Sequence, residues 1–280
     1  MAEIRFTKMH GIGNDYIYIN CMESTVDDPA SLSVKLSDRH TGIGGDGIIL
    51  ILPSTIADFK MRIFNADGSE ATMCGNGSRC VAKYVSDHGL TDRKVITLET
   101  LSGIKTLSLH TGSDGLVDEV TVDMGEPAFD AGAIPVRCQS ATMVDAPVDT
   151  SCGDVRLTAV SMGNPHGVVF VDSLDKVDFF TLGPELERHP MWPDRANIEF
   201  VEVISRERLK MRVWERGSGE TMACGTGACA TAVAAALTGR SAREVTVSLR
   251  GGDLRIKWGD DGHVYMTGPA AEVFNGIVTV

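Results

Sequence analysis

Hydrophobic residues along the chain occur mainly in short runs bounded by glycine, asparagine, aspartate or proline. Runs of four to seven aliphatic and β-branched residues between turn-forming residues predict strands. A pair of runs that flanks a glycine turn predicts a hairpin, here 106–110 with 117–123. The other predicted strands are 16–19, 48–51, 168–171 and 200–203. The pattern therefore predicts a chain built mostly from short strands.

Helical patterns are fewer. Pro29 follows two aspartates and predicts a helix that runs to about Arg39. The two best helix predictions are 77–88 and 227–238, because each run is followed by a glycine, the usual stop signal. The second of these runs contains six alanines and no charged residue, so we expect it to be buried on all sides.

The second half of the chain repeats the first half at a shift of 150 residues. Residues 62–77 align with 212–227, which lays Cys74 on Cys224. The same shift lays Asn14 on Asn164 and the run 48–52 on 198–202. An internal duplication predicts two similar units, and we infer an α+β fold. Each of the two pseudo-symmetric units is expected to be a mostly antiparallel or mixed β-sheet wrapped around a central α-helix.

Length and composition agree with two globular units. The chain has 280 residues, of which 43% are hydrophobic and 23% are charged. Its net charge of −12 argues against nucleic acid or an anionic membrane as a partner. No apolar run approaches the ~20 residues that span a bilayer, and the start lacks the long apolar stretch of a signal peptide. We therefore predict a cytoplasmic protein.

The seven cysteines do not suggest a disulfide framework or a metal site. Their number is odd, and no Cys-x-x-Cys pair occurs. Cys74 and Cys224, however, directly precede the two predicted glycine-led helices. A helix N-terminus carries about half a positive charge, which favours a thiolate and can bind a carboxylate. Two thiols at equivalent positions suit a racemase or epimerase, in which one thiolate removes a proton and a thiol returns one to the opposite face.

An alternative for any cysteine is that it packs as a small hydrophobic residue. We assign that role to Cys80 and Cys229, which lie inside the predicted helices. Cys21, Cys138 and Cys152 have no context that suggests a function. The duplicated glycine-rich setting favours a chemical role for Cys74 and Cys224.

Long motifs in both halves resemble the diaminopimelate epimerase family. They include residues 8–16, 64–70, 73–77, 162–166 and 215–227, and the resemblance covers nearly the whole chain. It implies a cofactor-independent isomerase of lysine and peptidoglycan-precursor synthesis that converts LL- to meso-diaminopimelate without a metal. It also implies that the final strand joins the first unit, which would comprise residues 1–126 and 270–280, with a second unit of 127–269. A homodimer is possible.

The resemblance also assigns the site. Cys224 would accept a proton and Cys74 donate one in the LL-to-meso direction. Residues that would bind the substrate are Asn14, Asn65, Gly75, Asn76, Asn164, Asn197, Glu215, Arg216, Gly225 and Thr226. His166 and Glu215 would adjust the pKa of the thiols.

These residue types fit a substrate with two ammonium and two carboxylate groups. Arginine can hold a carboxylate with two parallel hydrogen bonds, and asparagine both donates and accepts. Each also has a simpler interpretation. An asparagine beside glycine is commonly a turn residue, Glu215 and Arg216 could form a solvated pair, and His166 could be a core histidine. His10 and His40 keep that simpler interpretation.

Position 47 departs from part of the family, because some members have glutamine where this chain has Gly47. A proline or hydroxyproline racemase-type enzyme is the nearest alternative, although its cyclic substrate would make little use of Arg216. A non-catalytic amino-acid-binding module on the same scaffold and a thiol peptidase are the others. The intact cysteine pair disfavours the module, and only His166 could serve a peptidase as base.

Overall fold

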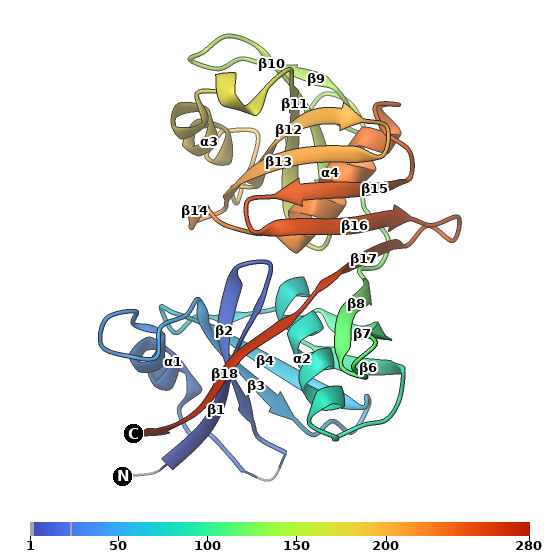
Figure 1. Ribbon diagram of the computed structural model, residues 1–280. Helices are drawn as coiled ribbons and strands as arrows, with labels where there is room; N and C mark the ends of the chain where they lie inside the picture. Colours follow the sequence, from blue (N-terminus) through green and yellow to red (C-terminus); the bar gives the residue numbers. More distant parts are fainter. Residues whose placement is uncertain (1–2, 23) are drawn as a thin grey trace. The chain divides into compact units, whose positions relative to one another are not determined.

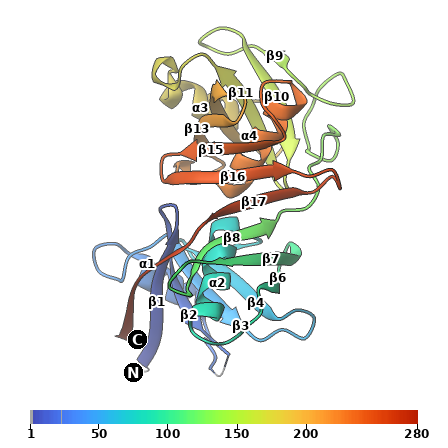
Figure 2. The same cartoon turned by 45° about the vertical axis from the view of Figure 1, so that its right-hand side comes forward.

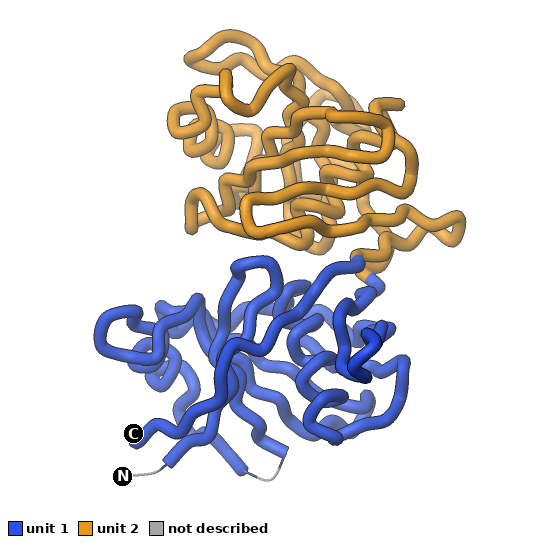
Figure 3. Tube along the Cα trace, in the orientation of Figure 1, with its two compact units in different colours: residues 1–123, 267–280 blue, residues 124–266 orange. Residues whose placement is uncertain are grey.

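The computed structural model describes residues 3–22 and 24–280; residues 1 and 2, with which the predicted first unit begins, and residue 23 lie outside the described part. The chain divides into two compact units (Figure 3). The first comprises Met1–Asp123 and Thr267–Val280, and the second comprises Met124–Met266. The sequence places these boundaries after residues 126 and 269.

The first unit is a mixed sheet with two helices in its described residues, α1 (Pro29–Ser37) and α2 (Gly75–Asp87) (Figure 1). Its strands are β1 (Glu3–Gly11), β2 (Asn14–Asn20), β3 (Gly47–Leu52), β4 (Phe59–Asn65), β5 (Glu70–Ala71), β6 (Val95–Thr100), β7 (Gly103–Thr111), β8 (Val117–Asp123) and β18 (Ala271–Thr279). The strands pair in the order β18–β1–β2–β3–β4–β6–β7–β8, with β5 added to β4. The β2–β3 and β4–β6 pairs are parallel and the others are antiparallel.

The second unit repeats this topology. Its strands are β9 (Ala146–Val148), β10 (Val155–Ser161), β11 (Pro165–Val171), β12 (Asn197–Ser205), β13 (Arg208–Glu215), β14 (Gly219–Glu220), β15 (Glu244–Leu249) and β16 (Gly252–Trp258). They pair in the order β9–β10–β11–β12–β13–β15–β16, with β14 added to β13. Here β11–β12 and β13–β15 are the parallel pairs. The chain returns to the first unit within β17 (Val264–Pro269).

The helices of the second unit are α3 (Phe179–Glu187) and α4 (Gly225–Leu237), with a short 3-10 turn at Leu174–Lys176. Both helices lie 150 residues beyond their counterparts α1 and α2. The predicted hairpin is confirmed, since Leu107 of β7 pairs with Val122 of β8. The predicted α+β fold with two units of like topology is therefore confirmed.

The sequence did not predict α3. Gly183 and Pro184 lie inside it and disfavour a helix. The repeat contains the missing signal, because Asp28 caps α1 by accepting the N–H of Ser31, and Asp178 caps α3 by accepting the N–H of Thr181. Applying the 150-residue shift to the predicted helix at Pro29 would have predicted α3.

The two helices of the first unit pack on opposite faces of β3. Ile48 and Leu50 lie in one hydrophobic cluster with Leu32 and Leu36 of α1. Ile49 points the other way, because side chains alternate along a strand. On that side α2 packs against β1, β7 and β8, as Figure 2 shows for β7 and β8. The sheet thus wraps around α2.

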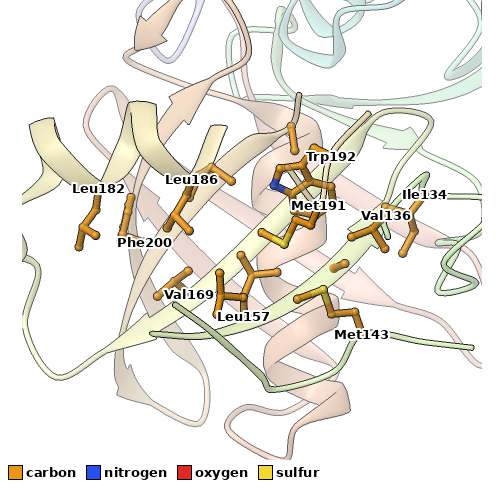
Figure 4. Packing of buried hydrophobic residues seen from close by; sticks show 14 of the residues in the cluster. Ile134, Val136, Met143, Leu157, Val169, Leu182, Leu186, Met191, Trp192 and Phe200 are labelled. Carbon is orange, nitrogen blue, oxygen red and sulfur yellow. The ribbon is translucent and has the colours of Figure 1, made fainter. Parts of the chain in front are cut away.

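In the second unit, Leu182 and Leu186 of α3 pack with Phe200 of β12 in a cluster that also contains Trp192 (Figure 4). The opposite face of β12 meets α4. Ala228 to Ala235 are all buried, as predicted for this uncharged helix, whereas Leu237 at its C-terminal end is exposed. Among the helices of residues 3–22 and 24–280, none combines the length and hydrophobicity required to span a membrane.

Candidate active site

Cys74 caps the N-terminus of α2. Its backbone is extended (φ −141°, ψ 112°), and its Sγ accepts the N–H of Gly77 at 3.3 Å. The thiol also donates to Oδ1 of Asn14 at 3.3 Å and is partly exposed. Both predicted cysteine helices begin two residues earlier than expected, at Gly75 and Gly225, because the cysteines themselves are the capping residues.

Two of the predicted substrate-binding asparagines surround Cys74. Asn14 donates from Nδ2 to Oδ2 of Asp46 at 2.7 Å, and its Oδ1 accepts from Nδ2 of Asn76 at 3.4 Å. Asn76 is 3% exposed, and its Oδ1 accepts from Nη2 of Arg79 at 2.8 Å. We call Asn14, Cys74 and Asn76 the first cysteine cluster. Its hydrogen bonds hold both amides in a fixed orientation beside the thiol.

Asn65 ends β4 and is held elsewhere. It donates from Nδ2 to Oγ of Ser69 at 3.0 Å, and its Oδ1 lies 3.5 Å from the hydroxyl of Tyr16. These contacts tie the side chain to the turn after β4 and to Tyr16 of β2 rather than to the first cysteine cluster.

Cys224 occupies the same N-cap position at α4, but it is more enclosed and lacks the side-chain capping hydrogen bond of Cys74. Its backbone is extended (φ −122°, ψ 109°), and the residue is 6% exposed. Its Sγ lies 3.6 Å from Oγ1 of Thr226. Burial raises the pKa of the Cys224 thiol well above its ordinary value, and the nearby carboxylate of Glu215 raises it further. This direction is opposite to the one expected from the sequence, where the helix N-terminus alone would favour the thiolate.

A chain of hydrogen bonds leads from β12 to the N-terminus of α4. Oε1 of Glu199 lies 2.7 Å from Nδ1 of His166, and Nε2 of His166 lies 3.0 Å from Oδ1 of Asn164. Asn164 in turn donates from Nδ2 to Oγ1 of Thr226 at 3.4 Å. We call Asn164, His166, Glu199, Cys224 and Thr226 the second cysteine cluster. His166 and Glu199 are both fully buried.

Glu215 lies beside the second cysteine cluster at the end of β13. Its Oε1 accepts a hydrogen bond from Oγ1 of Thr221, and burial raises the pKa of this carboxyl above its ordinary value. A hydrogen bond to the thiol of Cys224 opposes that rise. The structure thus brings Glu215 to the thiol whose pKa it was predicted to adjust.

Asn197 and Arg216 are joined to each other. Oδ1 of Asn197 accepts the main-chain N–H of Arg216 at 2.9 Å, and its Nδ2 donates to the carbonyl of Pro165 at 3.2 Å. Asn197 is 4% exposed, so these bonds use it to hold the backbone at Arg216. The guanidinium of Arg216 is exposed. Within the described part of the chain, its only side-chain hydrogen bond is donated to the carbonyl of Asp194 at 3.3 Å. Its remaining N–H groups can donate hydrogen bonds to a ligand.

The predicted main-chain binding groups stand at the two helix starts. Gly75 and Asn76 are the first residues of α2, and Gly225 and Thr226 are the first residues of α4. N–H groups in a first turn point out of the helix along its axis, where they favour an anion. The predicted position of these groups at helix N-termini is confirmed, and their role in binding stays a prediction.

Sequence reasoning missed two buried carboxylates of the second unit. Glu199 lies in a run that aligned with an apolar run of the first half, and a lone acid in such a strand was the available signal. Glu187, which is 1% exposed, accepts the N–H of Gly217 at 2.9 Å and the indole N–H of Trp214 at 3.2 Å. Its burial follows from tertiary packing, which no local pattern revealed.

Gly47 could not be replaced by glutamine without a backbone shift. A Cβ at this position would lie 2.1 Å from the carbonyl oxygen of Phe64 and 2.8 Å from the ring of Tyr16.

Potential metal ligands are not grouped in the described part of the chain: no three His, Cys, Asp or Glu side chains lie close enough to share a metal ion. The seven cysteines are all thiols.

Comparison with known proteins identifies relatives over nearly the full length. The family model described as "Diaminopimelate epimerase" matches residues 6–129 and 158–273. A diaminopimelate epimerase of Phocaeicola vulgatus is 58% identical over 275 residues, which cover 98% of this chain and 97% of the relative. One of Acetivibrio thermocellus is 57% identical over 276 residues, which cover 98% of each chain.

Solved structures with the same fold are far less similar in sequence. A phenazine biosynthesis protein of the PhzF family from Bacillus anthracis has a TM-score of 0.71 at 17% identity and covers 100% of both chains. A hydroxyproline epimerase from Agrobacterium vitis, with bound trans-4-hydroxy-L-proline, has a TM-score of 0.69 at 17% identity. The match covers 99% of this chain and 91% of that one. At this identity the likeness extends to the fold alone. The family match and the identities above 50%, by contrast, show that the chain is an isomerase and belongs to the diaminopimelate epimerase family.

Proposed function

We propose that this enzyme interconverts LL- and meso-2,6-diaminopimelate by moving the proton of one α-carbon, with no cofactor. The observation that carries the proposal is that Cys74 and Cys224 cap two equivalent helices of a duplicated unit. The names of the relatives supply the substrate. Together they favour a two-base mechanism.

The two thiols would divide the proton transfer between them. In the LL-to-meso direction, the Cys224 thiolate takes the α-proton, so the C–H bond breaks and an S–H bond forms. The electron pair stays on the α-carbon. The Cys74 thiol then gives its proton to the opposite face and becomes a thiolate. The enzyme is left in the protonation state that suits the reverse reaction, and exchange with water resets it.

The α-carbon of an unactivated amino acid is a weak acid, so developing negative charge must be stabilised. The N-termini of α2 and α4 supply main-chain N–H groups at Gly75, Asn76, Gly225 and Thr226. Oriented N–H groups in a site that excludes water stabilise such charge strongly. This explains how the reaction could proceed without pyridoxal phosphate or a metal.

The remaining predicted residues would bind the distal end of the substrate. Arg216 presents an exposed guanidinium that suits a carboxylate, and Glu215 suits an ammonium group. The amides of Asn14, Asn65 and Asn164 can orient a zwitterion without adding charge. Asn197 would act through the backbone that it holds at Arg216.

The proposal has consequences for the setting of the enzyme. It would act in lysine and peptidoglycan-precursor synthesis, and its need for reduced thiols favours the cytoplasm. A homodimer is part of the proposal as well. Val273, Phe274 and Ile277 on β18 expose large apolar side chains, which a second copy could cover.

Incubation with LL-diaminopimelate in heavy water tests the function. We expect deuterium at the α-carbon together with formation of the meso isomer, measured by mass spectrometry and chiral chromatography. L-proline and trans-4-hydroxy-L-proline should show neither change.

Each other outcome points to a different function. Exchange and inversion of proline alone would replace the proposal with a proline racemase-type activity. Calorimetric binding of diaminopimelate without exchange, in fully reduced protein, would identify an amino-acid-binding module.

A further inference from the structure

Glu199 is a carboxylate in a place where the first unit has a hydrocarbon. It lies on β12 between Ile198 and Phe200, and its side chain points toward α4. The 150-residue shift lays it on Ile49, whose side chain points toward α2 in the same way. A Cβ on Gly77 would lie 2.7 Å from Cδ1 of Ile49, and a Cβ on Gly227 would lie 2.6 Å from Oε1 of Glu199.

Burying an acid at this position needs compensation. Glu199 is 0% exposed, and transfer of a charged carboxylate out of water is costly unless it is paired and hydrogen-bonded. Its Oε1 meets Nδ1 of His166, while Oε2 is buried with no hydrogen-bond partner. The His166 ring, also 0% exposed, is therefore the main partner of the acid.

The hydrogen bonds fix how many protons this pair holds. With Oδ1 of Asn164 facing the ring, as the amide is placed in the structure, Nε2 of His166 carries a proton and donates it. One further proton must lie between Nδ1 of His166 and Oε1 of Glu199 to make their 2.7 Å contact a hydrogen bond. Whether it resides on nitrogen or on oxygen, the pair as a whole is electrically neutral.

The orientation of Asn164 depends on that proton. Because Nε2 of His166 donates to Oδ1, the amide nitrogen of Asn164 turns toward Oγ1 of Thr226 at the start of α4. A histidine with its proton on Nδ1 would face Oδ1 with a bare nitrogen, and the amide would have to turn over. The Nε2–H tautomer and this orientation of the amide therefore require each other, and Glu199 is the group that contacts the other nitrogen of the ring.

We propose that Glu199 is a positioning residue: as the acid of a neutral, proton-sharing pair, it fixes the tautomer of His166 and through it the orientation of the Asn164 amide. This rests on the proposed function, in which Asn164 binds the substrate. The neutral pair also limits the charge near the thiol. Glu215 and Cys224 are the other titratable groups that face this pair.

Two substitutions separate the hydrogen bond from the charge. Glu199→Gln can donate from its amide to Nδ1 of His166, and so it preserves the Nε2–H tautomer. Glu199→Met has a similar size but cannot donate or accept strongly. Because a misoriented hydrogen bond to a charged ligand group costs about tenfold or more in affinity, we expect Glu199→Met to raise KM for LL-diaminopimelate by about that factor, with a smaller change in kcat.

The glutamine variant should restore function. We expect its KM and kcat to remain within about threefold of the wild type, since one neutral donor replaces another. Its profile of kcat/KM against pH should also be unchanged. A shift of that profile to lower pH would overturn the neutral pair, because loss of a bare carboxylate would lower the pKa of Cys224.

Nuclear magnetic resonance of ¹⁵N-histidine-labelled protein gives a readout that does not depend on activity. The His166 signals, assigned with a His166→Gln variant, should show a protonated Nε2 in the wild type and in Glu199→Gln. In Glu199→Met we expect the fixed tautomer to be lost. Glu202→Gln, a half-buried acid on the opposite face of β12, is the matched control and should change neither the kinetics nor these signals.

The outcomes separate this inference from the proposed function. If the wild type neither exchanges nor inverts diaminopimelate, the function fails, and the tautomer measurement still judges the role of Glu199. Wild-type kinetics and an unchanged His166 tautomer in a folded Glu199→Met variant would overturn the inference. An equal rise in KM in Glu199→Gln and Glu199→Met would overturn it as well.

Discussion

The N-termini of α2 and α4 have the same backbone conformation but differ in the exposure of their cysteines and in the charged groups nearby. Both helices have 13 residues, begin at glycine and are capped by an extended cysteine. Cys74 is partly exposed, and its Sγ accepts an N–H from its own helix at 3.3 Å. Cys224 is 6% exposed, and burial together with the nearby Glu215 carboxylate raises its pKa.

The side chains beneath the two helices account for this difference. In the first unit, Ile49 lies under α2, and the fully buried guanidinium of Arg79 donates to Asn76 at 2.8 Å. In the second unit, Glu199 takes the place of Ile49, and Cys229 takes the place of Arg79. The two units have thus kept the helix and its N-cap cysteine, but the charged residues beneath the helix differ between them. Equivalent thiols in equivalent backbones need not be equivalent acids.

Removal of either thiol should have the largest effect. We expect Cys74→Ala and Cys224→Ala each to lower the epimerisation rate by about 10²–10⁴-fold, the usual contribution of a general acid or base. In heavy water the two variants should differ. Cys74→Ala retains the base for the LL isomer, so it should exchange that α-proton without inversion, whereas Cys224→Ala should do so only for the meso isomer.

Mass spectrometry after separation of the isomers measures this difference. Cys80→Ala, in which a fully buried thiol inside α2 is removed, serves as a control for loss of a cysteine. Full activity in either of the two main variants would disprove the two-base mechanism. Identical exchange in both would show that the two thiols have no preferred isomer.

The repeat explains how much of this the sequence could predict. The helices that follow the two cysteines and the repeated strands were predicted because glycine, apolar runs and a 150-residue shift are local or periodic signals. The cysteines were not predicted as the capping residues, since both helices begin two residues earlier than expected. The buried acid Glu199 was not predicted. Glu199 acts through His166, which is 33 residues away in sequence, and its contact depends on the parallel pairing of β11 with β12. No local pattern encodes such a pairing.

The glycines at the third helix position give a smaller, matched test of the comparison. Gly227→Ala would place a methyl group 2.6 Å from Oε1 of the buried, hydrogen-bonded Glu199. Gly77→Ala would place one 2.7 Å from Cδ1 of Ile49, the flexible end of a side chain. Overpacking costs about 1–3 kcal/mol, and alanine regains about 1 kcal/mol of helix propensity.

We therefore expect Gly227→Ala to lower the free energy of unfolding by about 1–2 kcal/mol, and Gly77→Ala to leave it nearly unchanged. Urea denaturation followed by circular dichroism measures both. Gly239→Ala is not a suitable control, because its positive φ of 73° would add backbone strain. Equal destabilisation of the two variants would mean that Ile49 is as rigid as Glu199.

The smallest expected effect concerns Glu215, whose counterpart under the 150-residue shift is the uncharged Asn65. Burial raises the pKa of the Glu215 carboxyl in the folded protein, so the folded state binds its proton more tightly than the unfolded state does. The stability associated with this group is fully present below the ordinary carboxyl pKa and is lost as pH rises through the raised one.

Glu215→Gln has no such dependence and can still accept the Thr221 hydroxyl. Its stability relative to the wild type should therefore increase from pH 4 to pH 8, by less than the Gly227→Ala effect, in urea titrations at each pH. Glu244→Gln, which removes an exposed acid on β15, should show no comparable trend. If the stability of Glu215→Gln relative to the wild type did not change with pH, the acid would be solvated like an ordinary surface carboxyl. The contrast between the two cysteine helices would then rest on Glu199 and burial alone.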